Sequence, residues 1–454
     1  MFCNAAPVVM LWFYRLLFLP VLVVLSPRYF RRMSRRGGYR TNFSQRFGSV
    51  PRLPARRAGV RRIWLQAVSV GEVLAIAPLL EAFKGDPEVE VYLTTTTSTG
   101  YRQALDRYSG SAVAIGYFPI DWWWFSRRAW RAVAPDLVVL TEGERWPEHI
   151  HQAVSRGVPI LCINARISDR SFHRLCAFRF LVSPLLGGIT RLLPCSEGDE
   201  ARFRELGFPA GRISTTGNIK LDVTLPPLPP EERARLVRET GLGSGPVLLG
   251  SSTWPGEEAA LLDALRRARS SGLPASLMIV PRHAERRNEI AALLKTSGFS
   301  HHFRSHGAAG GPVDVSVADT TGELRTLTQL ADLVFVGKSL PPHTEGQTPV
   351  EAAALGKPIL FGPDMGNFRQ ISRELVAAGA ARVVGDGQAL AAGAVALLGD
   401  EPARFAMAAA ARGWHRANQG AVVRTLRVIR DELARLDQDA VRRTGGGTRS
   451  DLAG

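Results

Sequence analysis

The strongest constraint on the fold is a unit that recurs along the chain, in which a short apolar run leads through a polar turn into an amphipathic run. Ile63–Val68 is the first apolar run, and Val73–Phe83 carries apolar side chains at helical spacing after the turn Ser69–Glu72. The apolar run indicates a buried strand, and the spacing that follows indicates a helix covering it. Strands that alternate with helices predict a parallel, doubly wound α/β sheet.

The unit recurs in two sets, which are separated by the proline-rich stretch Pro226–Pro230. Such a stretch is typical of a semi-rigid spacer between domains. We therefore expect two Rossmann-like domains of similar size. The expected division is a membrane anchor with an Arg-rich neck (1–36), an N-terminal domain (37–224), a C-terminal domain (225–436) and a flexible tail (437–454).

The apolar segment Ala5–Leu25 begins the chain, and basic residues follow it. Lys and Arg number 57 against 41 Asp and Glu, and Ser26–Arg62 holds twelve of the Arg and no acid. A signal peptide has the opposite order of charge and apolar core. We expect a single N-terminal membrane anchor with everything after it in the cytoplasm. Because Arg15 and Pro20 interrupt the segment, a helix lying in the membrane interface is the alternative.

Glu72 is the candidate general base. It lies in the first turn of the helix after the first strand, and ligands of open α/β sheets bind at such strand-to-helix turns. It is also the first acidic residue of the chain. The alternative is that Glu72 only complements the helix dipole and the free amides of the helix start.

Charged residues follow other expected strands in the same way. Glu142 and Glu144 come after the run Leu137–Leu140, although they would equally suit a solvated acidic turn. Lys220 follows Ile213–Thr216, where it could reach a phosphate or a sugar. These positions predict one edge of a ligand cleft.

The second half offers candidate groups for binding a nucleotide. Arg282 follows an expected strand, where its guanidinium could grip a phosphate in bidentate fashion. The turn Gly322–Leu324 could hold a ribose or a base edge, and a long loop leads into a helix at Pro349 with Glu351 in its first turn. The chain has no GxxxxGK[ST] motif and no GxGxxG after its first strand, which disfavours ATP hydrolysis and dinucleotide binding. The sequence contains no CxxC pair, and it contains no Asp-x-Asp motif before residue 437. It therefore does not suggest a metal site.

Ten motifs together resemble one family of glycosyltransferases, the 3-deoxy-D-manno-octulosonic acid (Kdo) transferases of lipopolysaccharide synthesis, which have the two-domain GT-B fold. The likeness runs from the anchor to about Leu436. The motifs are Ser69–Glu72, Thr95–Gly100, Pro119–Asp121, Glu142–Pro147, Asn164–Arg166, Gly217–Asp222, Ser252–Glu258, Pro281–His283, Gly322–Glu323 and Glu351–Ala353.

The resemblance implies an activity and a role for each matching residue. The N-terminal domain would bind the lipid acceptor, a lipid A precursor (lipid IVA), and the C-terminal domain would bind the donor CMP-Kdo across the cleft. Transfer would invert the anomeric carbon, with Glu72 as general base and with Glu144 and Lys220 stabilising the transition state. No metal and no cofactor beyond the donor would be needed. The CMP-binding positions would be Pro281, Arg282, Gly322, Glu323, Leu324, Thr348, Pro349, Val350 and Glu351.

Three departures from the family pattern put donor specificity in doubt. Trp254 replaces the usual His of a Ser-Thr-His-x-Gly-Glu-Glu motif, Lys338 replaces the second residue of a glycine pair, and Thr348 replaces Asn. Thr348 keeps a hydroxyl and Lys338 adds a positive charge, so CMP binding is still expected.

Two other functions fit the same residues. One is a different GT-B enzyme, a transferase or epimerase that uses another nucleotide sugar. The other is a catalytically silent, membrane-tethered binding protein that has kept the fold. A nucleic-acid-binding surface is disfavoured because the basic excess is confined to the neck rather than spread over a domain.

Overall fold

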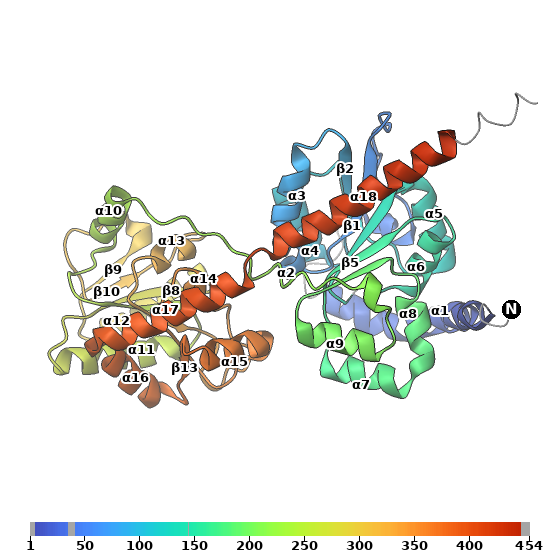
Figure 1. Ribbon diagram of the computed structural model, residues 1–454. Coiled ribbons are helices and arrows are strands. Elements are labelled where there is room, and N and C mark those ends of the chain that lie inside the picture. The colour runs from blue at the N-terminus through green and yellow to red at the C-terminus, as the bar shows by residue number, and fades with distance from the viewer. Residues whose placement is uncertain (1–4, 35–40, 144, 446–454) are drawn as a thin grey trace, which may run out of the picture. The chain divides into compact units, whose positions relative to one another are not determined.

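The chain forms two compact units in the computed structural model, which describes residues 5–34, 41–143 and 145–445 (Figure 1). The first unit comprises Met1–Lys220 and Gly420–Gly454, and the second comprises Leu221–Gln419. Each unit is an α/β domain built on its own parallel sheet.

The sheet of the first unit has six parallel strands in the order β3-β2-β1-β4-β5-β6. From β1 the strands follow one another outward to β3 on one side, and from β4 they follow one another outward to β6 on the other. The boundary between β1 and β4 is therefore the topological switch point, where open α/β sheets bind ligands. The expected run Ile213–Thr216 is not a strand, since only an isolated bridge joins Ile213 to Leu192. The strands are β1 (Arg61–Gln66), β2 (Val89–Thr95), β3 (Ala114–Tyr117), β4 (Leu137–Thr141), β5 (Ile160–Ala165) and β6 (Arg191–Pro194).

The helix expected after the first strand is two helices, because it breaks at Ile76. The break separates α2 from α3, and Pro78 lies in the first turn of α3. Proline lacks an N–H and favours the start of a helix, so it accounts for the new beginning. The helices of the first unit are α1 (Ala5–Ser34), α2 (Val70–Ala75), α3 (Ala77–Lys84), α4 (Ser98–Tyr108), α5 (Trp123–Val133), α6 (Pro147–Val154), α7 (Asp169–Ala177), α8 (Val182–Leu186), α9 (Glu197–Glu205) and α18 (Ala421–Gly445).

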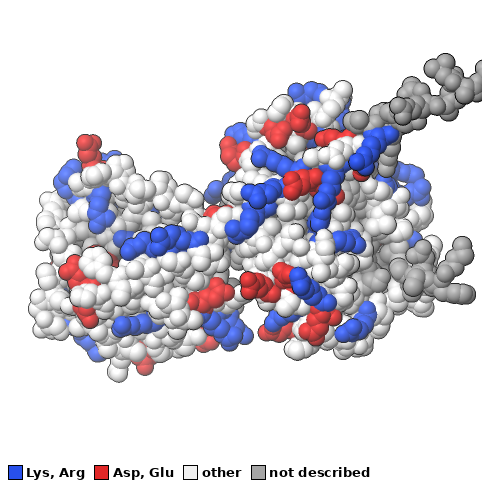
Figure 2. All heavy atoms as spheres, in the orientation of Figure 1, with Lys and Arg blue, Asp and Glu red and all other residues white. Residues whose placement is uncertain are grey.

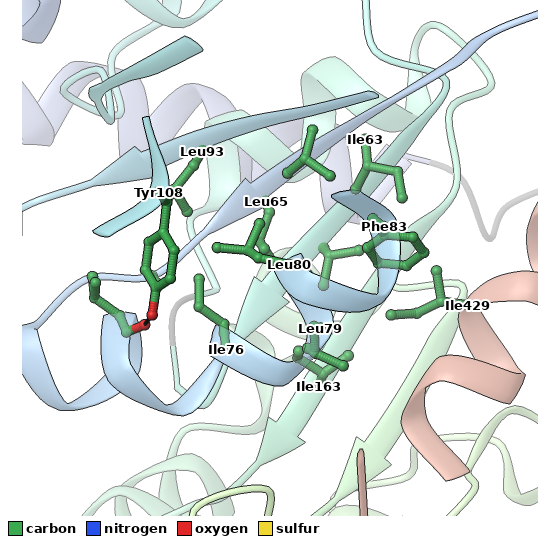
Figure 3. Close-up of a cluster of buried hydrophobic side chains, with 14 of the residues drawn as sticks. Ile63, Leu65, Ile76, Leu79, Leu80, Phe83, Leu93, Tyr108, Ile163 and Ile429 are labelled. Atoms are coloured by element: carbon green, nitrogen blue, oxygen red, sulfur yellow. Dashed lines mark hydrogen bonds between the residues drawn. The ribbon is translucent and has the colours of Figure 1, made fainter. Parts of the chain in front are cut away.

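Apolar side chains from β1, α2 and α3 form one face of the core of the first unit (Figure 3). Ile63 and Leu65 of β1 face Ile76 and Phe83, and all four are almost fully buried. Ile429 of α18 packs in the same cluster. The last helix of the chain therefore completes the core of the first unit.

The sheet of the second unit has seven parallel strands in the order β13-β12-β11-β7-β8-β10-β9. The topological switch point of this sheet lies between β7 and β11. The strands are β7 (Val247–Thr253), β8 (Ser276–Pro281), β9 (His301–Phe303), β10 (Val315–Val317), β11 (Leu333–Val336), β12 (Ile359–Phe361) and β13 (Ala381–Val383). The helices are α10 (Pro230–Thr240), α11 (Glu257–Ser270), α12 (Arg287–Lys295), α13 (Leu324–Thr328), α14 (Val350–Ala354), α15 (Arg369–Ala377), α16 (Gly387–Gly399) and α17 (Glu401–Asn418).

The end of the chain differs from the expected division. We expected the second domain to run to residue 436 and a flexible tail to follow, whereas the chain returns to the first unit at Gly420 and α18 continues to Gly445. The physical reason is the apolar face of α18, on which Ala421, Ile429 and Leu433 are buried in the first core. Asp437 of the expected tail pairs with Arg61 of β1, 2.6 Å from oxygen to nitrogen.

The expected N-terminal helix is present as α1, and Val9–Pro27 within it is long and apolar enough to cross a membrane. Length and composition alone are weak support for a span. On the face drawn in Figure 2, basic and acidic side chains are interspersed on both units. That face does not carry the continuous basic stripe of a nucleic-acid-binding surface.

Candidate active site

Glu72 lies at the switch point of the first sheet, in the first turn of α2 directly after β1. Its side chain is buried, with 8% of the residue exposed. One carboxylate oxygen, Oε2, accepts the N–H of Val68 at 2.9 Å and the hydroxyl of Thr141, at the end of β4, at 2.5 Å. The other, Oε1, accepts the hydroxyl of Ser69 at 3.0 Å. Three donors from two adjacent strand ends therefore fix the carboxylate, which suits a base that must be held in position.

Glu142 follows Thr141 directly and forms an ion pair with Lys220. Glu142 has a positive φ of 53°, a backbone conformation that non-glycine residues rarely adopt. Strain of this kind concentrates at functional sites. Glu142 is the residue next to Thr141, whose hydroxyl holds Glu72. Two of the three predicted catalytic residues, Glu72 and Lys220, therefore have partners at the end of β4.

Asn164 of β5 holds the segment that carries Lys220. Its Oδ1 accepts the N–H of Ile219 at 3.0 Å, and its backbone also has a positive φ, of 49°. No hydrogen-bond partner for its buried Nδ2 is found in the described part of the chain. The predicted Glu144 lies outside the described residues.

Glu257 lies at the switch point of the second sheet, at the start of α11 and after β7. It is almost fully buried, and its carboxylate accepts four backbone N–H groups. Oε2 accepts those of Trp254 and Lys338 at 2.9 and 2.8 Å, while Oε1 accepts those of Ser339 and Leu340 at 2.9 and 3.2 Å. One carboxylate therefore fixes the loop after β11 against the loop after β7.

Gly337 permits this close approach of the two loops. A Cβ atom at this position would lie 2.5 Å from the carbonyl oxygen of Ser252 and 2.8 Å from Oε2 of Glu257. Both distances are shorter than real side-chain contacts, so any other residue would push the loops apart.

Glu258 and Arg286 fix the turn that carries the predicted Arg282. Glu258 is buried and accepts two hydrogen bonds from Arg286, at 2.6 and 3.1 Å. Burial alone would lower the pKa of Arg286, but its hydrogen bonds with Glu289 and Glu258 raise it above the usual value. The Arg282 side chain is exposed, whereas its backbone N–H donates to the carbonyl of Thr253 at 3.1 Å. Arg282 is therefore presented to solvent from a rigid turn at the end of β8.

The other predicted binding positions lie after neighbouring strands of the same sheet. Gly322 has a φ of 89°, and Glu323 accepts two hydrogen bonds from Arg304 at 2.8 and 2.9 Å. Thr348 Oγ1 accepts the N–H of Val350 at 3.3 Å. Glu351 is 3.5 Å from Arg325, and its second carboxylate oxygen is buried with no partner among the described residues. The helix expected at Pro349 is short, since α14 spans Val350–Ala354.

Two of the three departures from the family pattern contact each other. The Lys338 Nζ lies 4.2 Å from the centre of the Trp254 ring, in cation–π geometry. His283 and His343 pack on the same ring, with centroids 5.3 and 5.7 Å away. Trp254 therefore lies beside the turn that carries Arg282, and the two departures form one structural feature.

The sequence alone did not indicate several groups that build these sites. Thr141 has no role predicted from the sequence, and Asn164, Glu257 and Glu258 occur only within motifs that resemble the family. A buried acid at the beginning of a helix is a weak signal, because capping explains it equally well. Among the described residues no three His, Cys, Asp or Glu side chains are grouped to hold a metal ion.

Two doubly wound domains, with fixed polar groups at the switch point of each, define a protein of the GT-B class. Solved structures agree with that fold. A UDP-N-acetylglucosamine 2-epimerase from Listeria monocytogenes has a TM-score of 0.55 at 16% identity, covering 83% of this chain and 97% of its own. The epimerase from Neisseria meningitidis has a TM-score of 0.54 at 14% identity, covering 81% of this chain and all of its own (100%).

The family follows from sequence comparison. Residues 41–223 match the family described as 3-deoxy-D-manno-octulosonic-acid transferase (kdotransferase). The 3-deoxy-D-manno-octulosonic acid transferase of Bordetella pertussis is 34% identical over 89% of this chain and 95% of its own length. That of Haemophilus influenzae is 31% identical over 92% of this chain and 96% of its own. The chain belongs to the 3-deoxy-D-manno-octulosonic acid transferase family, and it is a glycosyltransferase, as the motifs predicted.

Proposed function

We propose that this protein transfers Kdo from CMP-Kdo to a lipid A precursor (lipid IVA) in lipopolysaccharide biosynthesis, with inversion at the anomeric carbon. Family membership over 89% of the chain supports the transfer of Kdo. The observation that carries the catalytic part is the buried Glu72 carboxylate, held by three donors at the switch point of the first sheet. The acceptor, the inversion and the residue roles are our proposals.

Inversion by a single displacement needs one base and a stabilised leaving group. Glu72 would take the proton from the acceptor hydroxyl while the oxygen of that hydroxyl forms a bond to the anomeric carbon of Kdo. The bond from that carbon to the phosphate oxygen would break at the same time, and CMP would leave with the electron pair. Lys220 and Glu144 would stabilise the charge that develops during this step.

The donor would bind to the second unit, through the turns after β8, β10 and β11. The Arg282 side chain faces solvent from a turn that is fixed by backbone and side-chain hydrogen bonds, and its guanidinium suits the phosphate of CMP. The second carboxylate oxygen of Glu351, which has no partner in the described part of the chain, suits a ribose hydroxyl. The CMP-binding set would therefore be Pro281, Arg282, Gly322, Glu323, Leu324, Thr348, Pro349, Val350 and Glu351.

Replacing Arg282 with alanine is expected to raise the KM for CMP-Kdo about 10- to 100-fold, because a hydrogen bond to a charged group is worth about 1.5–3 kcal/mol. Steady-state kinetics with varied donor at saturating acceptor measure the effect. Arg266→Ala is the matched control, since Arg266 is an exposed arginine on α11 whose partner is Asp263. A KM unchanged within twofold in Arg282→Ala would remove Arg282 from the donor site.

The proposed reaction is tested by incubating the purified protein with CMP-Kdo and lipid IVA in detergent. Mass spectrometry should detect the lipid with added Kdo, and chromatography should detect an equal amount of CMP. Turnover of UDP-sugars without turnover of CMP-Kdo would favour another GT-B enzyme and would reject this assignment. We expect no requirement for a metal ion, so added EDTA should leave the rate unchanged.

We also propose that the protein acts at the cytoplasmic face of the inner membrane. The lipid acceptor would remain in the membrane, so the catalytic domains must be held beside it. The apolar helix α1 and the Arg-rich segment after it support this location.

A further inference from the structure

Two polar side chains in the middle of α1 bind to the folded part of the first unit. The Tyr14 hydroxyl donates to Oδ2 of Asp121 at 2.7 Å. Arg15 donates to both carboxylate oxygens of Glu148, from Nε at 2.8 Å and from Nη2 at 3.1 Å. Only 12% of the Arg15 side chain and none of the Glu148 side chain is exposed. We call these the Tyr14–Arg15 contacts.

The acidic partners of these contacts are fixed within the domain. Asp121 also accepts the backbone N–H groups of Glu148 and His149, at 3.0 and 2.8 Å, so it caps the start of α6. Glu148 accepts a further hydrogen bond from Gln152 at 2.6 Å. Neither carboxylate could follow α1 into a bilayer without disrupting α6. Tyr14 and Arg15 of α1 are therefore held against the surface of the first unit.

The Tyr14–Arg15 contacts are incompatible with α1 crossing a membrane. The hydrocarbon core of a bilayer is about 30 Å thick, and a helix rises about 1.5 Å per residue. With Arg15 held against the domain, residues 16–27 would reach roughly 18 Å and residues 5–14 roughly 15 Å. Each arm is too short to span, although the whole segment Val9–Pro27 would be long enough by itself.

The side of α1 that faces away from the domain is apolar and exposed. Leu11, on the same side as Tyr14 and Arg15, is buried, and α1 contacts α6 and α8 of the domain. The exposed side chains on the opposite side include Val9, Trp12, Phe13, Leu16, Leu17 and Val24, of which Leu16 is 70% exposed. An exposed apolar face of this size marks a contact with lipid or protein.

Charge and aromatic residues next to this face favour lipid. The ring of Trp123, at the start of α5, lies 5.9 Å from the Arg15 guanidinium and 5.7 Å from that of Arg127. Arg127, Arg128 and Arg131 of α5 are exposed, as is Trp124. Exposed tryptophan and arginine beside an apolar helix face suit the headgroup region of an anionic bilayer.

We propose that α1 lies in the plane of the membrane surface, fastened to the first unit by the Tyr14–Arg15 contacts, and does not cross the bilayer. This inference rests on the membrane location in the proposed function, and not on the reaction itself. Of the two arrangements that the sequence allows, a spanning anchor and a helix in the membrane interface, the Tyr14–Arg15 contacts favour the second.

Depth-dependent fluorescence quenching tests this arrangement in the full-length protein. Cys3, Cys176 and Cys195 are replaced with serine, and a fluorophore is attached at Val9→Cys or Val24→Cys. The labelled proteins are bound to phosphatidylcholine–phosphatidylglycerol vesicles that contain lipids brominated at known depths. We expect both labels to be quenched at the same shallow depth. Glu81→Cys, on the exposed side of α3, should show no quenching.

Several outcomes would overturn the inference. Labels in opposite leaflets, or one at the bilayer centre, would show that α1 spans the membrane. Unquenched labels together with self-association would show that the apolar face binds a second copy of the chain. Kdo transfer measured in the same vesicles separates these outcomes from failure of the proposed reaction, since the label depths do not depend on turnover.

A variant without the contacts tests their role directly. In Tyr14→Phe/Arg15→Leu the labels should move deeper, because nothing then holds the middle of α1 at the domain. Arg107→Leu is the matched control, since it removes the charge of an exposed arginine on α4 of the same unit and should leave the depths unchanged. Thermal unfolding in detergent checks that the variants are folded. Unchanged depths in the folded double variant would show that these contacts do not keep the helix in plane.

Discussion

Replacing Glu72 with glutamine is expected to lower kcat for Kdo transfer by about 10²- to 10⁴-fold, the usual contribution of a positioned general base. Glutamine should not disturb the fold, because its amide oxygen can still accept from Val68 and Thr141 in place of Oε2. Its NH₂ group would then face Ser69, whose hydroxyl can turn to accept a hydrogen bond. The loss should therefore be in chemistry rather than in folding.

The measurement is the initial rate of CMP release at saturating CMP-Kdo and lipid acceptor, together with the midpoint of thermal unfolding. Glu81→Gln is the control, because Glu81 is an exposed acid on α3, the helix that follows α2. A rate within threefold of the wild type in Glu72→Gln would mean that another group accepts the proton. If lipopolysaccharide in cells also stayed unchanged in Glu72→Ala, a catalytically silent binding protein would be the better description.

Replacing Glu257 with alanine is expected to cost the second unit roughly 3–5 kcal/mol of unfolding free energy, because it leaves buried donors without an acceptor. Four backbone N–H groups share this carboxylate, and they belong to the loops after β7 and β11. Water can enter and satisfy some of them, which keeps the expected loss below the sum of four lost hydrogen bonds. The freed loops should also weaken donor binding.

Urea unfolding followed by tryptophan fluorescence measures the stability, and the KM for CMP-Kdo measures the donor site. Glu257→Gln should have an intermediate effect, since one of its two acceptor oxygens becomes a donor facing N–H groups. Glu285→Ala is the exposed control, with 81% of its side chain accessible to solvent. A loss below about 1 kcal/mol in Glu257→Ala would show that water replaces the carboxylate at little cost.

Regular strands with continuous apolar sequences could be predicted closely from the sequence. The run Leu137–Leu140 lies within β4 (Leu137–Thr141), and the run Ile63–Val68 differs from β1 (Arg61–Gln66) by two residues at each end. The two strands that were missed, β9 and β13, have three residues each and expose two of them at least partly. These short segments become strands because they pair with β10 and β12, and their own sequences lack the apolar run that would predict a strand.

The course of the last helix could not be predicted for a different reason. The amphipathic pattern of α18 shows that one face must be buried, but not against which core. The nearest preceding helices belong to the second unit, so an assignment by sequence order places α18 there, whereas Ile429 and Leu433 pack in the first.

The positions of Glu72 and Arg282 at strand ends were predictable from the apolar runs before them, which form β1 and β8. The position of Lys220 was not predictable in this way, because the run before it, Ile213–Thr216, is not a strand. Partners that are distant in sequence were not predictable. Thr141 donates to Glu72 from 69 positions away, and Glu257 accepts from Lys338 over 81 positions. Only the order of the strands brings these groups together, and a single sequence does not fix that order.

The return of the chain at Gly420 makes the second unit an insertion within the first. Leu221–Gln419 is one uninterrupted stretch, so a gene fragment encoding it would carry a whole domain. The first unit cannot be obtained by cutting the gene at one point, since a product ending before Gly420 would lack Ile429 and Leu433 and would leave an apolar surface of its core open to solvent. Deletions within α18 should therefore impair the first unit, although its six strands are all encoded before the second unit.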